Sequence, residues 1–317
     1  MDCRKKLVLI LAGIVITGCS LGLQPTPREE AEAEGWIQLA SMPTPRSEMA
    51  AAVIGGVIYV PGGFGGERKF EAYEIVTDTW TTLADLPEPR HHLMVTAFDG
   101  KIYIFGGGSS VVDWVPTSKA WVYDPAEDKW TAIAAMPEGR VAGAAATLEK
   151  YIYITGGIGG TNALLRYDPA QEEWTSLAPL SESREHNAGV ALDGRIWAIG
   201  GRWQGKDELT SVEIYEPASD RWISGPELNT ARAGFTVVPM NGELYALGGE
   251  ILSGKNQALT SIEIMAPDKN KWVLGPDLPL PLHGVPAVSV GGTLYVLGGA
   301  DMPGAISNQG LVFAYRP

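Results

Sequence analysis

A Gly-Gly pair follows a short apolar stretch six times along the chain. The stretches read "VIYVPGG", "KIYIFGG", "YIYITGG", "RIWAIGG", "ELYALGG" and "TLYVLGG", and their pairs begin at Gly62, Gly106, Gly156, Gly200, Gly248 and Gly298. An aromatic residue stands three positions before each pair, and successive pairs lie 44 to 50 residues apart. A period of this length indicates a repeat architecture, in which each repeat is one supersecondary unit.

Each repeat predicts four short strands. The first ends in a two-residue turn such as "DG", "NG" or "GG", which β-hairpins favour. The Gly-Gly stretch is the second strand, a third carries a tyrosine, and a fourth begins at a tryptophan seven residues later, as in Tyr73 and Trp80. β-Branched and aromatic residues alternate within these runs, and Gly, Pro, Asn and Asp separate them, which favours strands over helices. Four strands repeated at this period predict the blades of a β-propeller.

The order Gly-Gly, Tyr, Trp resembles the kelch repeat over about residues 36–317. The fifth repeat departs from the pattern, because Met265 replaces the tyrosine. The resemblance implies an all-β fold, a six-bladed kelch β-propeller. The expected blades span 47–84, 91–134, 141–178, 185–226, 233–276 and 283–317, the last together with 36–40.

The two ends of the repeat region predict how the ring closes. The sixth repeat stops at "LVFAYRP", before its tryptophan strand, and the missing tryptophan stands at the other end as Trp36. We therefore expect an N-terminal strand to complete the last blade, which removes an open sheet edge. The glycine pairs are expected where neighbouring blades approach closely and a Cβ would clash.

The first residues indicate export. A basic "MDCRKK" precedes the apolar "LVLILAGIVITG", which is too short to span a bilayer comfortably. The stretch leads into Cys19 and resembles a bacterial lipobox. Residues 1–18 are therefore expected to be a lipoprotein signal peptide, and residues 19–35 a lipidated cysteine and a flexible acidic tether. The protein would be exported and lipid-anchored to the bacterial envelope, with the outer membrane as one candidate; a plain secretory signal or a membrane anchor is the alternative.

Composition excludes several classes of function. The only cysteines are Cys3 and Cys19, so the repeat region has neither a disulfide nor a cysteine nucleophile or metal ligand. The net charge of -13 argues against a nucleic-acid partner, which requires a basic face. We expect the membrane to be contacted through the lipid anchor alone.

The loops between second and third strands vary most, and they share one face with the loops between fourth and first strands. Binding commonly resides in variable loops on a rigid scaffold. The fourth-to-first loops place an arginine at the channel mouth in five repeats and Leu282 in the sixth; the arginines are Arg46, Arg90, Arg140, Arg184 and Arg232. These arginines could clamp a carboxylate or phosphate, or could brace the blades.

The four histidines follow the same positions: His91 and His283 come one residue later, and His92 and His186 come two residues later. Glu48 and Glu185 belong to the same ring. Successive strand residues point to opposite faces, and no register holds more than two histidines. We therefore expect no three-histidine metal site and no cofactor, and we interpret the histidines as polar lining of the rim.

Two tryptophans remain outside the repeat in the variable loops. Trp114 and Trp203 could each stack on a sugar ring or anchor a peptide, or could fill its own loop as a local hydrophobic plug. The candidate ligand-binding rim consists of Arg46, Arg90, His91, His92, Trp114, Arg140, Arg184, Glu185, His186, Arg202, Trp203, Arg232 and His283.

Three functions follow as hypotheses. The first is a binding module for a protein, peptide or glycan at the channel mouth. The second is a small-sugar enzyme resembling sialic-acid mutarotases, in which Arg184, Glu185 and His186, together with Arg202, would serve as acid, base and anion-binding groups. The third is a structural part of the envelope.

Overall fold

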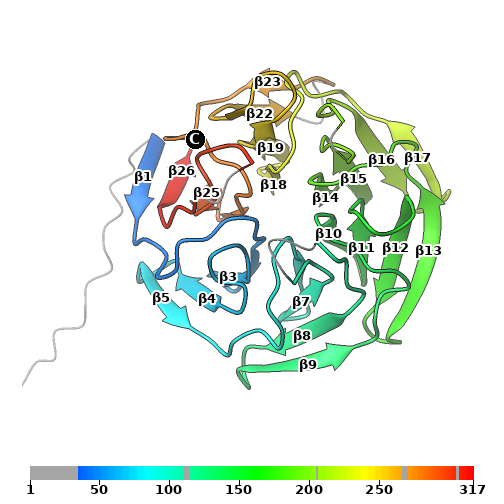
Figure 1. Ribbon diagram of the computed structural model, residues 1–317, viewed down its shortest axis with the longest axis horizontal. Helices are drawn as coiled ribbons and strands as arrows, with labels where there is room; N and C mark the ends of the chain where they lie inside the picture. Colours follow the sequence, from blue (N-terminus) through cyan, green and yellow to red (C-terminus); the bar gives the residue numbers. More distant parts are fainter. Residues whose placement is uncertain (1–34, 110–113, 205, 266–269, 305–306) are drawn as a thin grey trace, which may run out of the picture. The chain divides into compact units, whose positions relative to one another are not determined.

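The computed structural model describes residues 35–317, except 110–113, 205, 266–269 and 305–306. Residues Glu34–Pro317 form one compact unit, in which six four-stranded sheets surround a central axis (Figure 1). Within the described residues every regular element is a strand, and none is a helix long and apolar enough to cross a membrane. The expected signal peptide, Cys19 and the tether up to residue 34 lie outside the described residues.

The six blades follow one another around the ring, each is an antiparallel sheet, and in the first five the strands pair in chain order. The first three blades are β2 (Ala52–Ile54), β3 (Val57–Pro61), β4 (Phe70–Glu74) and β5 (Thr79–Thr82); β6 (Met94–Phe98), β7 (Lys101–Phe105), β8 (Ala120–Asp124) and β9 (Lys129–Ile133); and β10 (Ala144–Leu148), β11 (Tyr151–Thr155), β12 (Ala163–Asp168) and β13 (Glu173–Pro179). The next two are β14 (Ala188–Leu192), β15 (Arg195–Ile199), β16 (Val212–Glu216) and β17 (Arg221–Ser224); and β18 (Thr236–Met240), β19 (Glu243–Leu247), β22 (Ile262–Met265) and β23 (Val273–Leu274). A small hairpin, β20 (Glu250–Ile251) and β21 (Gln257–Ala258), extends from the fifth blade.

The sixth blade combines both ends of the unit. It contains β24 (Ala287–Val290), β25 (Thr293–Leu297), β26 (Val312–Arg316) and, as its outer strand, β1 (Gly35–Leu39). This confirms the predicted closure by the N-terminal strand. Because every blade is completed within residues 34–317, this unit is a closed fold by itself.

The repeated tryptophans fasten neighbouring blades. The indole Nε1–H of each donates to a backbone carbonyl of the preceding blade, at N···O distances of 2.8 to 3.0 Å. The donors are Trp36, Trp80, Trp130, Trp174, Trp222 and Trp272. Trp272 is also almost fully buried in the core between the fourth and fifth blades. The repeat therefore encodes contacts between blades as well as the fold of each blade.

The glycine pairs lie where two blades meet, as predicted. Gly62 has φ of 63°, and a Cβ built there would stand 2.5 Å from the Arg90 carbonyl oxygen of the next blade. The neighbouring Gly63 N–H donates to that same oxygen, at 2.9 Å. Only glycine combines this left-handed backbone with so close an approach.

Candidate functional site

The repeated arginines are buried inside the blades. All five are at most 4% exposed. Arg46 Nη1 donates to the carbonyl oxygens of Val60 and Gly62, at 3.1 and 2.7 Å, and its Nη2 pairs with Glu71 at 2.7 Å. This guanidinium therefore joins the second and third strands of its own blade.

The other arginines brace their blades in related ways. Arg140, Arg184 and Arg232 each donate to the carbonyl of the first glycine in the pair of their own blade, at 2.9 to 3.1 Å. Arg90 instead contacts Glu88, and its Cζ lies over the Trp121 ring, 5.6 Å from the ring centroid. Of the two roles open to these arginines, the structure shows bracing, and none of the five lines the chamber described below.

Two positions after each arginine, or after Leu282, the chain forms a ring around the axis. The backbone N–H of each such residue donates to the carbonyl of its counterpart in the preceding blade, at 2.7 to 3.2 Å. All six residues have a left-handed backbone, with φ between 50° and 61°. We call them the hub ring: Glu48, His92, Ala142, His186, Gly234 and Gly284.

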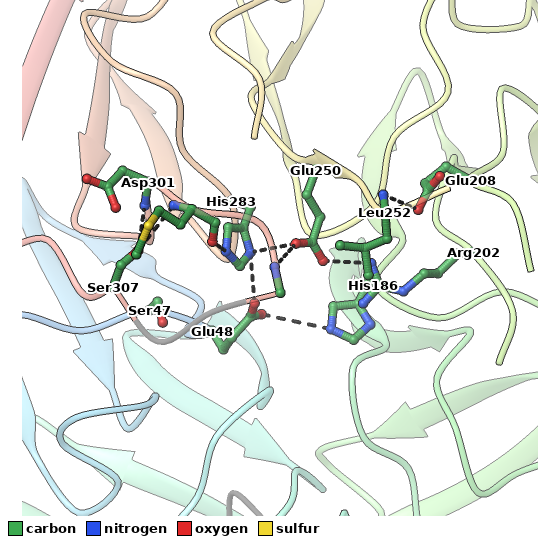
Figure 2. A network of polar contacts seen from close by, with 12 residues as sticks. Ser47, Glu48, His186, Arg202, Glu208, Glu250, Leu252, His283, Asp301 and Ser307 are labelled. Atoms are coloured by element: carbon green, nitrogen blue, oxygen red, sulfur yellow. Dashed lines mark hydrogen bonds and ion pairs between the residues drawn. The ribbon is translucent and has the colours of Figure 1, made fainter. Parts of the chain in front are cut away.

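Three histidines converge on one carboxylate of this ring. Glu48 Oε2 lies 2.9 Å from His92 Nε2 and 4.0 Å from His186 Nε2, and Glu48 Oε1 lies 3.2 Å from His283 Nδ1. Figure 2 shows Glu48 with contacts to His283 on one side and His186 on the other. The argument from strand register did not anticipate this convergence, because His92 and His186 have left-handed φ and so do not follow the alternation of an extended strand.

A second layer of charge surrounds these histidines. Glu185 contacts His186 Nδ1 through one oxygen and Arg202 Nε, at 3.2 Å, through the other. Arg202 Nη1 also donates to Glu250 at 2.7 Å, and Glu250 lies 3.4 Å from His283 Nδ1. Sequence reasoning missed Glu250. It directly follows a glycine pair, as Arg202 does, so comparing the residue after each pair would have revealed it.

The cluster separates two cavities. The central channel, of about 440 Å³, is lined by the innermost strands of all six blades. A chamber of about 110 Å³ lies on the other side; we call it the mouth chamber, and it is lined by Glu48, Phe64, His92, Trp114, His186, Arg202, Glu250, His283 and Gly304. Among the described residues, only Glu48, His92 and His186 line both cavities. These three side chains therefore form the partition between mouth and channel.

Trp114 lies over this partition. Its ring centroid is 4.3 Å from that of His92 and 5.7 Å from that of His186. His91 lies beside it, fully buried, with its Nδ1 2.6 Å from His92 Nδ1. Trp203, by contrast, is not among the residues that line the mouth chamber. Of the two loop tryptophans, the structure brings only Trp114 to the site.

The electrostatics of the cluster differ from residue to residue. Burial alone would raise the pKa of Glu48, but the charge of His92 and the contact with His283 outweigh it and hold this pKa well below its usual range. Burial, and then the charges of Arg202 and His92, lower the pKa of His186 well below its ordinary value. Burial would also lower the pKa of His283, but its contact with Glu48 and the charge of Glu250 raise it. His186 and His283 therefore differ in their affinity for a proton.

Comparisons with known proteins agree with the repeat. A solved structure titled "Structure of YjhT" superposes with a TM-score of 0.76 at 18% sequence identity, covering 86% of this chain and 95% of that one, which shows the fold. No curated protein matches the chain. The model of the KLHDC2/KLHL20/DRC7 kelch-repeats domain matches residues 31–201, and the kelch motif matches 183–229 and 231–279. The chain therefore belongs to the kelch-repeat family.

Proposed function

We propose that this kelch propeller binds a small hydroxylated ligand of the saccharide class in the mouth chamber, beneath Trp114. One observation carries the proposal: an aromatic ring lies over a chamber where buried carboxylates and imidazoles converge with a partly buried guanidinium. Aromatic faces stack on sugar rings, and carboxylates and imidazoles accept or donate hydrogen bonds to hydroxyl groups. Buried ionisable groups are costly, so their concentration in one place indicates function.

The size of the chamber favours a small molecule over a peptide. A volume of about 110 Å³ holds roughly ten groups the size of a water molecule, which corresponds to one sugar ring. The five arginines that could have bound an acidic peptide are buried and already bonded within their own blades. The saccharide therefore remains the better-supported class among the ligands that the sequence leaves open.

Catalysis on the same ligand is the second candidate. The described residues that line the chamber include three imidazoles and two carboxylates, and general acid–base catalysis requires such groups within hydrogen-bond reach of the substrate. Of the residues suggested by the resemblance to sialic-acid mutarotases, Glu185 and His186 contact each other, whereas Arg184 is engaged with Gly200 and Glu213. Interconversion of anomers would then fall to His186, which lines the chamber beside Arg202, with Glu185 in contact with its Nδ1.

We further propose that the propeller is exported and held at the bacterial envelope through lipidated Cys19. The basic start, the short apolar stretch and the cysteine that follows it support this. Incorporation of labelled palmitate into the full-length chain, lost in a Cys19→Ser variant, is the expected result. Equal labelling of the two proteins would contradict the anchor.

The ligand proposal is tested by a thermal-shift screen of residues 34–317. The panel contains neutral monosaccharides, acidic sugars including sialic acid, and short acidic peptides. A ligand present at 100 times its dissociation constant should raise Tm by about 5 °C. Anomer exchange of each hit is then followed by NMR, because acceleration by the protein distinguishes an enzyme from a binding module.

Two tryptophan variants provide the matched control. Trp114→Ala should abolish the Tm rise, whereas Trp203→Ala should keep it, because Trp203 does not line the mouth chamber. Stabilisation by peptides alone, or by sugars equally in both variants, would contradict the proposal.

A further inference from the structure

The partition between the two cavities carries a set of metal-ligand atoms. One carboxylate oxygen of Glu48 and one ring nitrogen each of His92 and His186 all lie within 4.8 Å of one another. We propose that Glu48, His92 and His186 bind one divalent transition-metal ion at the centre of the hub ring. The repeat does not supply these residues, since the other hub-ring positions are Ala142, Gly234 and Gly284.

The outer ring nitrogens of both histidines are held in the way that metal sites hold them. His186 turns Nδ1 to Glu185 and Nε2 towards Glu48. His92 turns Nδ1 to His91 Nδ1, at 2.6 Å, and Nε2 towards Glu48. In metal sites, a carboxylate or another acceptor on the far nitrogen fixes the tautomer and leaves the near nitrogen free to bind the ion.

The geometry of the contact between His92 and Glu48 gives further support. His92 Nε2 is buried and lies 2.9 Å from Glu48 Oε2, yet it has no partner in hydrogen-bond geometry among the described residues. The His92 side chain is only 3% exposed, so water does not readily replace such a partner. A buried nitrogen whose one charged partner lies outside hydrogen-bond geometry is incompletely satisfied, which is costly. A cation bound by Glu48 and His92 together removes that cost.

The spacing and chemistry of the three ligands fit a particular class of ion. Ligands about 2.1 Å from a tetrahedral zinc ion lie about 3.4 Å apart, so side-chain movements of about 1 Å would complete the site. Two imidazoles and one carboxylate favour zinc and similar first-row ions over calcium or magnesium, which prefer oxygen ligands. Because the three side chains line both cavities, the ion would keep open positions for water or a ligand.

His283 is assigned a positioning role. Its Nδ1 lies 3.2 Å from the second oxygen of Glu48, and its Nε2 donates to the Met302 carbonyl oxygen at 2.8 Å. It therefore holds the carboxylate whose other oxygen faces His92 and His186. The metal proposal does not depend on a saccharide, since the ion can be measured alone.

The test is metal binding by residues 34–317, purified without a histidine tag and stripped with a chelator. Equilibrium dialysis against Zn²⁺, followed by elemental analysis, should give one ion per chain. Co²⁺ should give visible absorption bands that Zn²⁺ abolishes. Bound Co²⁺ should also shift the imidazole NMR signals. These signals come only from the site, because the chain has four histidines and all of them lie there.

Variants separate ligands from their surroundings. His92→Ala and His186→Ala should each weaken Zn²⁺ binding by more than 100-fold, and His91→Ala by about 10-fold to 100-fold, as the loss of a partner to a ligand does. Glu208→Gln is the matched control, because Glu208 is buried nearby but is bound to Leu252 and Ser253. Far-UV circular dichroism verifies that each variant is folded. Fewer than one ion per wild-type chain, or equal affinity in folded His92→Ala, would overturn the proposal.

Discussion

Trp36 pairs with Tyr315 across β1 and β26, in the register in which Trp80 pairs with Tyr73 inside the first blade. The ring centroids of Trp36 and Tyr315 are 5.1 Å apart, close to the 5.2 Å between Tyr73 and Trp80. The chain thus divides one repeat between its two ends and rebuilds it by pairing them. Closure of the ring therefore depends on β1.

Loss of β1 should remove the cooperativity of unfolding. Deleting residues 36–40 leaves β26 as an open edge and removes the indole that donates to Asp277 of the fifth blade. The milder Trp36→Ala should lower the free energy of unfolding by about 3 kcal/mol, because it removes a large packed ring. Urea denaturation followed by circular dichroism measures both effects.

Trp36→Phe serves as the control for packing. It keeps an aromatic ring against Tyr315 and loses only the Nε1–H donor, so the free energy of unfolding should fall by about 1 kcal/mol. If the deletion variant unfolds with the midpoint and steepness of the full unit, β1 does not close the ring.

Removal of a bracing arginine should lower the free energy of unfolding more than removal of a surface charge would. Arg232 and Glu263 are both fully buried and lie 2.7 Å apart. Arg232→Leu leaves Glu263 buried without its cation, which should cost about 3 to 5 kcal/mol of unfolding free energy. Urea denaturation of the folded variant provides the measurement.

The sixth blade shows the apolar alternative to this pair. There Leu282 stands at the arginine position and Phe313 at the glutamate position. The double variant Arg232→Leu with Glu263→Leu should therefore recover part of the loss seen in the single variant. A single variant as stable as the wild type would show that the arginines do not brace the blades.

Two glycines with similar φ values allow the cost of backbone strain to be measured apart from the cost of steric crowding. Gly55 and Gly62 have φ of 57° and 63°, but a Cβ would meet no atom within 4 Å at Gly55 and the Arg90 carbonyl at 2.5 Å at Gly62. Gly55→Ala should cost about 1 to 2 kcal/mol, from the left-handed backbone alone. Gly62→Ala should cost at least about 2 kcal/mol more, because two blades must move apart. Equal losses in urea denaturation would contradict the close packing assigned to the glycine pairs.

The six-fold repeat made the scaffold predictable, but it did not predict which side chains meet at the site. Strand order, the closing strand and the glycine contacts follow from a pattern present six times. The convergence of His92 and His186 on Glu48 does not, because it depends on left-handed φ values that a sequence with histidine and glutamate at these positions does not reveal. Trp114 is a candidate from its loop alone, and a comparison of the residues that follow the glycine pairs would have added Glu250.

The location of the functional site is tested most directly by the imidazole NMR signals of residues 34–317, labelled at histidine, during titration with a saccharide that raises Tm. His92, His186 and His283 line the mouth chamber, so their signals should shift in proportion to the fraction of protein bound. A saccharide that stabilises the protein while leaving all four histidine signals unchanged would contradict a functional site at the hub ring.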